Sequence, residues 1–128
     1  MSENNSCVNF RTEKTSYGVE VVFISGPLDI LNSAKLWDRL SEIIRSDVLK
    51  VVVDVAQVEL LVAGGVSVFL NAQKELLKRG GNLKISGVER AGDGFQKVFK
   101  IATLNFQFET YVSAEDAVAS FGPPCVAV

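Results

Sequence analysis

The pattern of apolar and polar positions predicts two β-strands at the start of the chain. Val8 to Thr12 and Val19 to Ser25 are rich in β-branched and aromatic residues, and the polar segment between them ends in Tyr17-Gly18. Such a segment is typical of a hairpin connection. The second run is apolar on almost both faces, which is typical of a strand inside a sheet. We therefore expect a hairpin whose second strand is covered on both sides.

Helical spacing follows the hairpin. Gly26-Pro27 ends the second strand, and Asn32 or Ser33 is suited to cap the helix that follows. Apolar residues then recur at helical intervals from Leu36 to Ile44. The β-branched run from Val51 to Val55 predicts a short buried strand after this helix.

The alternation of strands and helices continues to the end of the chain. A second helix is expected to begin at Gly64-Gly65 and to end at Gly80-Gly81, where glycine favours a left-handed turn. Asn82 to Ser86 then predicts a strand. The remaining elements are expected as a helix, a strand and a helix, at Phe95–Ala102, Phe106–Val112 and Ser113–Phe121.

This order of elements predicts an α/β fold. Strands that alternate with helices pair in parallel through right-handed crossovers, and the opening hairpin adds an antiparallel strand. A chain of 128 residues is long enough to bury a sizeable core without disulfides or a structural metal. We expect a single domain at residues 8–121, with a mostly parallel sheet, helices around it, and flexible tails at 1–7 and 122–128.

Composition narrows the functional classes. The chain carries 13 basic and 15 acidic side chains, a net charge of −2, whereas a nucleic-acid-binding protein needs a concentrated basic face. The chain contains no histidine, which excludes imidazole as a base or metal ligand, and with it Ser-His-Asp and Cys-His hydrolysis. We therefore expect neither a nucleic-acid partner nor an enzyme of these classes.

The cysteines and the apolar stretches indicate where in the cell the protein is expected. Cys7 and Cys125 lie near opposite ends of the sequence and form no metal-binding spacing, which is typical of a reduced intracellular protein. Met1 to Ser6 is polar, so no signal peptide is expected, and stretches such as Leu60 to Val66 are too short to span a bilayer. The sequence therefore predicts a cytoplasmic protein without direct membrane insertion.

Few residues that could take part in catalysis or ligand binding lie in the loops that follow the predicted strands. Gly64-Gly65 lacks the Lys-Ser/Thr pair of a phosphate-binding loop, and Gly92-x-Gly94 lacks the third glycine of a dinucleotide fingerprint. We interpret both glycine pairs as backbone devices. Asp29 is interpreted as a turn or helix-approach residue, and Asp54 as an acceptor of hydrogen bonds at a strand end. No catalytic residue, metal ligand or cofactor is predicted.

Residues 8–121, taken together, resemble the STAS domain, the family of sulphate transporters and anti-sigma-factor antagonists, and above all its stand-alone bacterial antagonists. The resemblance lies in the order of several short segments along the chain. These segments are Val22-Phe23-Ile24-Ser25-Gly26-Pro27-Leu28-Asp29, Val51-Val52-Val53-Asp54, Gly80-Gly81-Asn82-Leu83-Lys84-Ile85, Val98-Phe99-Lys100-Ile101-Ala102-Thr103-Leu104, Phe108-Glu109-Thr110-Tyr111 and Ser113-Ala114-Glu115-Asp116-Ala117.

The sequence departs from this family at the loop before the second helix. The family loop usually reads Asp-Ser-Ser/Thr-Gly, and a partner kinase that is also the anti-sigma factor phosphorylates the hydroxyl before the glycine. Aligned on Gly65, this chain has Val62, Ala63 and Gly64, none of which carries a hydroxyl. Phosphorylation in the usual manner is therefore not expected. Ser67 is the alternative acceptor, although a hydroxyl in the first turn of a helix more often serves local hydrogen bonding.

The resemblance implies a regulatory, non-enzymatic domain that acts on transcription through protein contacts. Its implied partner is an anti-sigma factor or a histidine-kinase-like ATPase, and Val62 is expected at the surface. The alternatives are a subunit or scaffold of a transport or signalling assembly, and an enzyme or small-ligand carrier. The residues expected to bind the partner are Asp29, Asn32, Leu61, Val62, Gly64, Gly65 and Val66.

Overall fold

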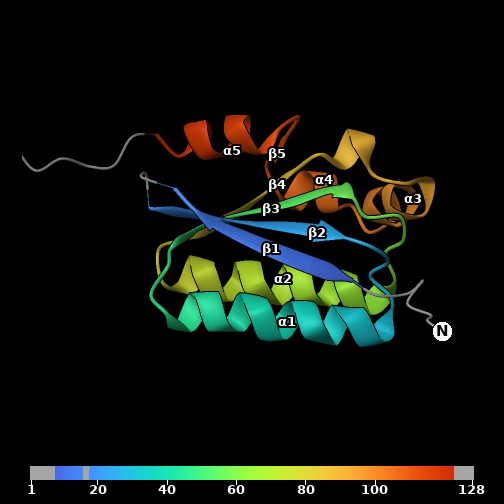
Figure 1. Cartoon of the computed structure of the whole chain (residues 1–128), viewed down its shortest axis with the longest axis horizontal. Coiled ribbons are helices and arrows are strands. Elements are labelled where there is room, and N and C mark those ends of the chain that lie inside the picture. The colour runs from blue at the N-terminus through green and yellow to red at the C-terminus, as the bar shows by residue number, and fades with distance from the viewer. Residues whose placement is uncertain (1–7, 16–17, 123–128) are drawn as a thin grey trace, which may run out of the picture.

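The protein folds into a five-stranded sheet with helices on both faces (Figure 1). The computed structural model describes residues 8–15 and 18–122. The strands lie in the order β1 (Asn9–Lys14), β2 (Val19–Ser25), β3 (Lys50–Gln57), β4 (Asn82–Ser86) and β5 (Thr110–Tyr111). The helices are α1 (Ile30–Arg45), α2 (Ala63–Lys78), α3 (Asp93–Ile101), α4 (Leu104–Gln107) and α5 (Ala114–Ser120), with a 3₁₀ turn, η1, at Val88–Arg90.

The pairing of the strands confirms the predicted α/β fold. β1 pairs with β2 antiparallel, and each following pair of neighbours is parallel. α1 and α2 lie side by side under one face of the sheet, and α5 lies across the opposite face (Figure 1). Of the predicted tails at 1–7 and 122–128, residues 1–7 and 123–128, with Cys7 and Cys125, lie outside the described residues.

The start of α1 differs from the prediction. The helix begins at Ile30, because the carboxylate of Asp29 caps it and accepts a hydrogen bond of 2.8 Å from the backbone amide of Asn32. Asn32 and Ser33, the predicted caps, instead lie in the first turn with their side chains buried. An aspartate at the N-cap is as effective as asparagine or serine, so the pattern around Asp29 allowed either start.

The strand predicted from Phe106 to Val112 exists but is much shorter, at Thr110–Tyr111. The segment begins in the short helix α4, which follows a left-handed turn at Thr103, and only Thr110–Tyr111 pairs with β4. In the structure Phe108 is buried in the core, whereas 84% of Phe106 is exposed.

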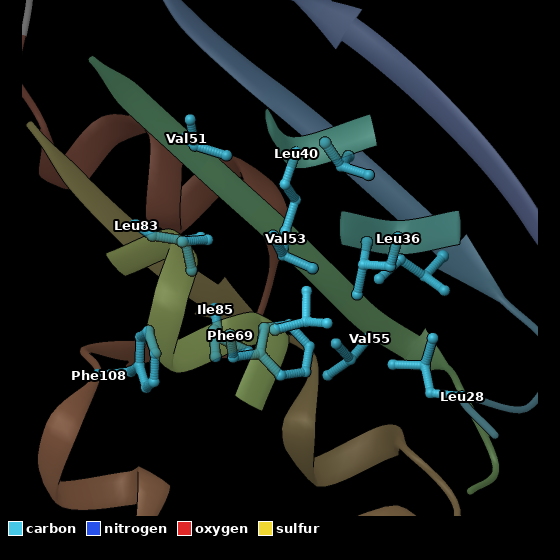
Figure 2. Close-up of a cluster of buried hydrophobic side chains, with 14 of the residues drawn as sticks. Leu28, Leu36, Leu40, Val51, Val53, Val55, Phe69, Leu83, Ile85 and Phe108 are labelled. Carbon is cyan, nitrogen blue, oxygen red and sulfur yellow. The ribbon is translucent and has the colours of Figure 1, made fainter. Parts of the chain in front are cut away.

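Most of the hydrophobic core lies between the sheet and the α1–α2 layer (Figure 2). Alternate residues of β2 point to opposite faces, so Val22 and Ile24 join this core while Val21 packs under α5. This two-sided burial confirms that β2 is an interior strand. Phe69 of α2 meets Phe108 edge to face, with 6.4 Å between the ring centroids, and so ties α2 to the segment before β5.

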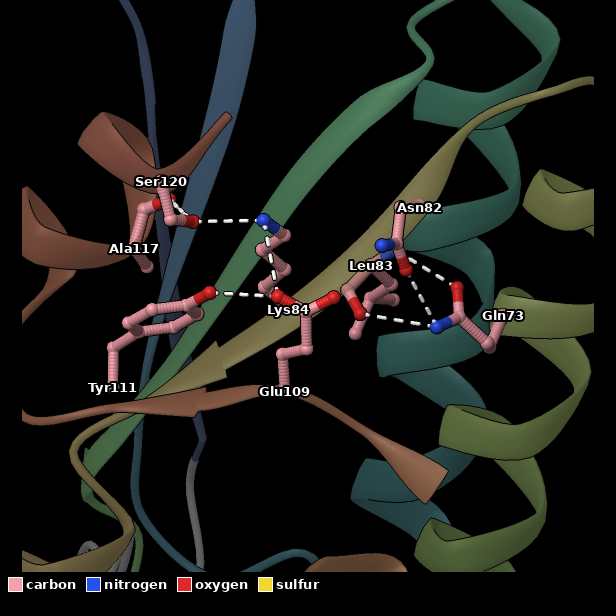
Figure 3. A network of polar contacts seen from close by, with 8 residues as sticks. All are labelled: Gln73, Asn82, Leu83, Lys84, Glu109, Tyr111, Ala117 and Ser120. Atoms are coloured by element: carbon pink, nitrogen blue, oxygen red, sulfur yellow. Dashed lines mark hydrogen bonds and ion pairs between the residues drawn. The ribbon is translucent and has the colours of Figure 1, made fainter. Parts of the chain in front are cut away.

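A buried lysine holds the last helix on the sheet (Figure 3). The side chain of Lys84 on β4 is 7% exposed, and its ammonium donates a hydrogen bond of 2.8 Å to the hydroxyl of Ser120. The same ammonium lies 3.3 Å from the carboxylate of Glu109 and 4.2 Å from the ring centroid of Phe121. Because a buried charge needs compensating partners, these contacts make the position of α5 depend on Lys84.

The side-chain amide of Gln73 covers the part of the outer edge of β4 that β5 does not pair with. Gln73 of α2 accepts a hydrogen bond of 2.8 Å from the amide of Leu83 and donates one of 3.2 Å to the carbonyl of the same residue (Figure 3). β5 reaches only Ile85 and Ser86 of β4. Gln73 therefore satisfies backbone groups that an exposed strand edge would offer to another chain.

We predict a pH-dependent contribution of Glu109 to stability. The hydrogen bond from the Tyr111 hydroxyl, and then the nearby Lys84, lower the pKa of Glu109 from its ordinary value of 4.5. A lowered pKa in the folded state stabilises the fold above the unfolded-state pKa, and the stabilisation is lost as the pH falls through the folded-state pKa. Glu109→Gln should lower the free energy of unfolding at pH 7, by less than about 1 kcal/mol because the carboxylate is largely exposed to water.

Urea unfolding of both proteins at pH 7 and at successively lower pH measures this effect. The difference between the wild type and Glu109→Gln should shrink as the pH falls below about 4. A difference that stays constant over this range would contradict the role of the ionised carboxylate.

Candidate functional site

The pairing between β2 and β3 continues into the loops that follow these strands. The amide of Gly26 donates to the carbonyl of Gln57 at 3.1 Å, and the amide of Leu28 donates to the carbonyl of Leu60 at 2.9 Å. The carbonyl of Leu28 then accepts a hydrogen bond of 3.2 Å from the amide of Val62. Because α1 and α2 begin directly after these bonds, their N-termini lie next to each other.

The first turns of the two helices are in close contact at Gly65. A Cβ atom on Gly65 would lie 2.6 Å from Cδ1 of Leu61 and 3.2 Å from Oγ of Ser33 on α1. A Cβ atom on Gly64 would come no closer than 3.8 Å to Ser33, which is an ordinary van der Waals distance. A side chain at Gly65 would therefore force buried Leu61 to shift, whereas the structure leaves room for a side chain at Gly64.

Four of the residues predicted to bind a partner support the loops. Asp29 caps α1, and Asn32 is 3% exposed and donates a hydrogen bond of 3.0 Å to the carbonyl of Pro27. Leu61 is 1% exposed and lies in the core, and Gly65 is buried against α1. In this structure these four residues fix the shape of the site; Asn32, Leu61 and Gly65 present little surface of their own, whereas Asp29 is half-buried.

The other predicted residues are accessible. Gly64 is exposed, together with Ala63, and Val62 and Val66 are half-buried. Val62 occupies the N-cap position of α2 with an extended backbone and gives no side-chain hydrogen bond to the helix. Ser67, the alternative phosphate acceptor, follows Val66 in α2 and is exposed. The accessible part of this helix start is thus apolar up to Ser67.

Two exposed residues at this site were missed by the sequence analysis. Ile30 and Leu31 form the start of α1 and are 81% and 68% exposed. They do not belong to the buried stripe of the helix that contains Leu36, and placing the helix start at Asn32 or Ser33 assigned them to a loop. The available signal was a pair of large apolar residues directly after a capping aspartate.

We call Ile30, Leu31, Val62, Ala63 and Gly64 together the α1–α2 surface. It contains no charged group and no hydroxyl. The first turns of α1 and α2 likewise contain no acidic residue. Such a surface offers neither a nucleophile nor a base, but it can bury apolar area against another protein.

The interpretations of Asp54 and of Gly92-x-Gly94 agree with the structure, whereas the interpretation of Gly64 as a backbone device was wrong, because a side chain fits there without a close contact. Asp54 is 7% exposed, and its two oxygens accept hydrogen bonds from the Ser86 hydroxyl at 2.8 Å and the Ala56 amide at 3.1 Å. A Cβ atom on Gly92 or Gly94 would lie within 2.9 Å of the backbone of Glu59, so both glycines allow a close backbone approach.

The described residues show neither a metal-binding cluster nor a membrane span. No group of three or more Cys, Asp or Glu residues within 8–15 and 18–122 is arranged to hold a metal ion. No helix in this part of the chain is both long enough and apolar enough to cross a membrane.

Comparison with known proteins identifies the family. A family model described as "Mlab, STAS domain" matches residues 13–106, and the chain therefore belongs to the STAS domain family. This confirms the resemblance seen in the sequence. A search of curated protein sequences finds no match.

Several solved structures share the fold. A crystal structure of an anti-sigma factor antagonist from Mycobacterium paratuberculosis superposes with a TM-score of 0.78 at 21% identity, over 94% of this chain and 97% of that one. The phosphorylated form of the Bacillus cell fate determinant SpoIIAA gives 0.68 at 18% identity, over 88% and 99%. A sulfate transporter family protein from Wolinella succinogenes gives 0.64 at 21% identity, over 80% and 84%.

The two glycines of the site are expected to respond differently to the same substitution. Gly65→Ala should lower the free energy of unfolding by about 1–3 kcal/mol, because the new methyl group overlaps buried Leu61. Gly64→Ala should be neutral or should raise it by up to about 1 kcal/mol, because alanine favours the helix and meets no atom closely. Urea unfolding at neutral pH compares the two variants, and equal effects would contradict the packing described at Gly65.

Proposed function

We propose that this chain is a non-enzymatic protein-binding domain that acts in partner switching, in the manner of an anti-sigma factor antagonist. Its docking site is the α1–α2 surface, and its partner is an anti-sigma factor or a histidine-kinase-like ATPase of a bacterial cytoplasm. The observation that carries the proposal is the exposure of Ile30 and Leu31 beside the apolar start of α2.

The energetics favour docking at this surface. Complete burial of one large aliphatic side chain is worth about 1.5–3 kcal/mol, so Ile30 and Leu31 are suited to act as anchors. Anchors of a protein interface lie at its centre, where water is excluded, and neighbouring residues need only fit closely. Val62, Ala63 and Gly64 provide such a small, uncharged surround.

The proposed domain lacks the usual phosphorylation switch. A phosphate at a helix N-terminus adds about −1.5 to −2 charges, enough to prevent or promote docking through electrostatics and desolvation. Val62, Ala63 and Gly64 have no hydroxyl to receive that phosphate. The α1–α2 surface then remains uncharged, and the domain is available for binding at all times.

A second candidate role is that of a subunit or scaffold in a transport assembly. It is supported by the fold shared with the sulfate transporter family protein of Wolinella succinogenes. The neighbouring genes distinguish the two roles. A gene for an anti-sigma kinase or phosphatase favours partner switching, whereas a gene for a permease or a lipid-transport system favours the transport role.

A charge placed on the α1–α2 surface should weaken docking. Leu31→Asp and Val62→Asp would each force an unpaired carboxylate into a dry interface, which costs about 1–3 kcal/mol or more and corresponds to roughly a tenfold to hundredfold loss of affinity. Leu77→Asp is the matched control, because Leu77 is 59% exposed near the far end of α2. Calorimetric titration with the purified partner gives the affinities, and wild-type affinity for both surface variants would refute this placement.

The absence of the switch is tested by intact-mass analysis after incubation with the cognate kinase and ATP. The wild type should gain no phosphate. Gly64→Ser should gain one, because the structure has room for a side chain at this position and the hydroxyl stands where the family carries its acceptor. A stoichiometric phosphate on the wild type, on Ser67 or elsewhere, would overturn the proposed loss.

A further inference from the structure

A cavity of about 510 Å³ opens at the carboxyl ends of β2 and β3, on the face of the sheet that carries α5. The α1–α2 surface belongs to the helices on the opposite face (Figure 1). The volume lies in the range of small-molecule sites, and the carboxyl ends of parallel strands are where α/β sheets tend to bind ligands. The side chains that the argument uses are those of Arg11, Phe23, Asp54, Arg90 and Glu115.

The cavity wall combines an aromatic ring with a planar cation. Arg11 on β1 and Phe23 on β2 are directly paired across the strands, and the guanidinium carbon lies 4.1 Å from the ring centroid. Phe23 is half-buried, and the guanidinium of Arg11 covers one face of its ring. This arrangement suits a flat apolar group that is attached to an anion, because the ring takes the apolar part and the guanidinium takes the charge.

A second guanidinium, that of the exposed residue Arg90, lines the same cavity. Arg90 of η1 donates one hydrogen bond of 2.7 Å to the carbonyl of Val112, which orients the group while most of its five N–H donors stay available. Arg11 is paired with the carboxylate of Glu13 on the same strand. The spare donors of the two arginines can hold a carboxylate, for which guanidinium geometry is well matched.

The acidic groups of the cavity limit the charge of a ligand. Both oxygens of Asp54 already accept hydrogen bonds from the protein. Glu115 on α5 is exposed at the cavity and adds a negative charge there. Together with Glu13 beside Arg11, these carboxylates already offset the charge of the two arginines, so a ligand with a single negative charge is favoured over a dianion such as phosphate.

We propose that this cavity binds a small aromatic monocarboxylate, whose carboxylate contacts Arg11 and Arg90 and whose ring lies against Phe23. Phenylacetate is a suitable probe, and titration of the isotope-labelled full chain, followed by NMR of backbone amides and arginine Nε–H groups, measures binding. Saturable shifts at the cavity are expected, with a dissociation constant on the order of 1 mM. Acetate lacks the ring and benzyl alcohol lacks the charge, so each should bind at least about tenfold more weakly than phenylacetate.

Three variants test the assigned roles. Arg11→Gln and Arg90→Gln should each weaken phenylacetate binding by about tenfold or more, because each removes a charge-assisted hydrogen bond. Glu13→Gln should tighten binding, because it releases Arg11 from its ion pair. The matched control is Arg39→Gln, since Arg39 lies 5.8 Å from the ring of Phe10 outside the cavity, and it should leave the affinity unchanged.

Four results would overturn the proposal. These are the absence of saturable shifts, shifts confined to the α1–α2 surface, equal affinity in the wild type and both cavity arginine variants, and tighter binding of inorganic phosphate than of phenylacetate. The test does not involve the docking partner, so its result is separate from that of the proposed docking function.

Discussion

The hydrogen bonds that extend the β2–β3 pairing beyond the strands determine the rest of the site. Leu28 donates to the carbonyl of Leu60 and accepts from the amide of Val62, which places the starts of α1 and α2 side by side. The burial of Leu28 and Leu61 below this contact makes the arrangement costly to change. Gly65 then lets the two first turns approach, since any side chain there would meet Leu61 and Ser33.

The same sheet separates two kinds of surface. On the α1–α2 side, exposed Ile30 and Leu31 adjoin a helix start that has no hydroxyl and no charge, which suits protein docking. On the α5 side lie polar and charged groups, including buried Lys84 and Arg11 of the sheet and Arg90 of η1. Membership of the STAS family accounts for the shared scaffold, and the differences between the two faces come from this chain's own side chains.

Much of the fold could be predicted from the sequence because its signals are local. β2 and β4 have the predicted bounds, since β-branched runs flanked by glycine or turn residues define them well. The start of α1 and the segment around Phe106 could not be predicted, because Asp29 is an equally good cap and because alternating phenylalanines do not reveal which of them is buried. Exposure of Ile30 and Leu31 depends on that helix start, and the cavity depends on strands and loops that are far apart in sequence.

Amide hydrogen exchange of this chain, alone and with its purified binding partner, tests most directly whether the paired helix starts form the docking site. Slower exchange on binding is predicted at residues 28–34 and 60–67, because these segments carry Ile30, Leu31 and the start of α2. The α5 face should exchange at the same rate in both states. Protection confined to the α5 face, with unchanged exchange at 28–34 and 60–67, would contradict the account.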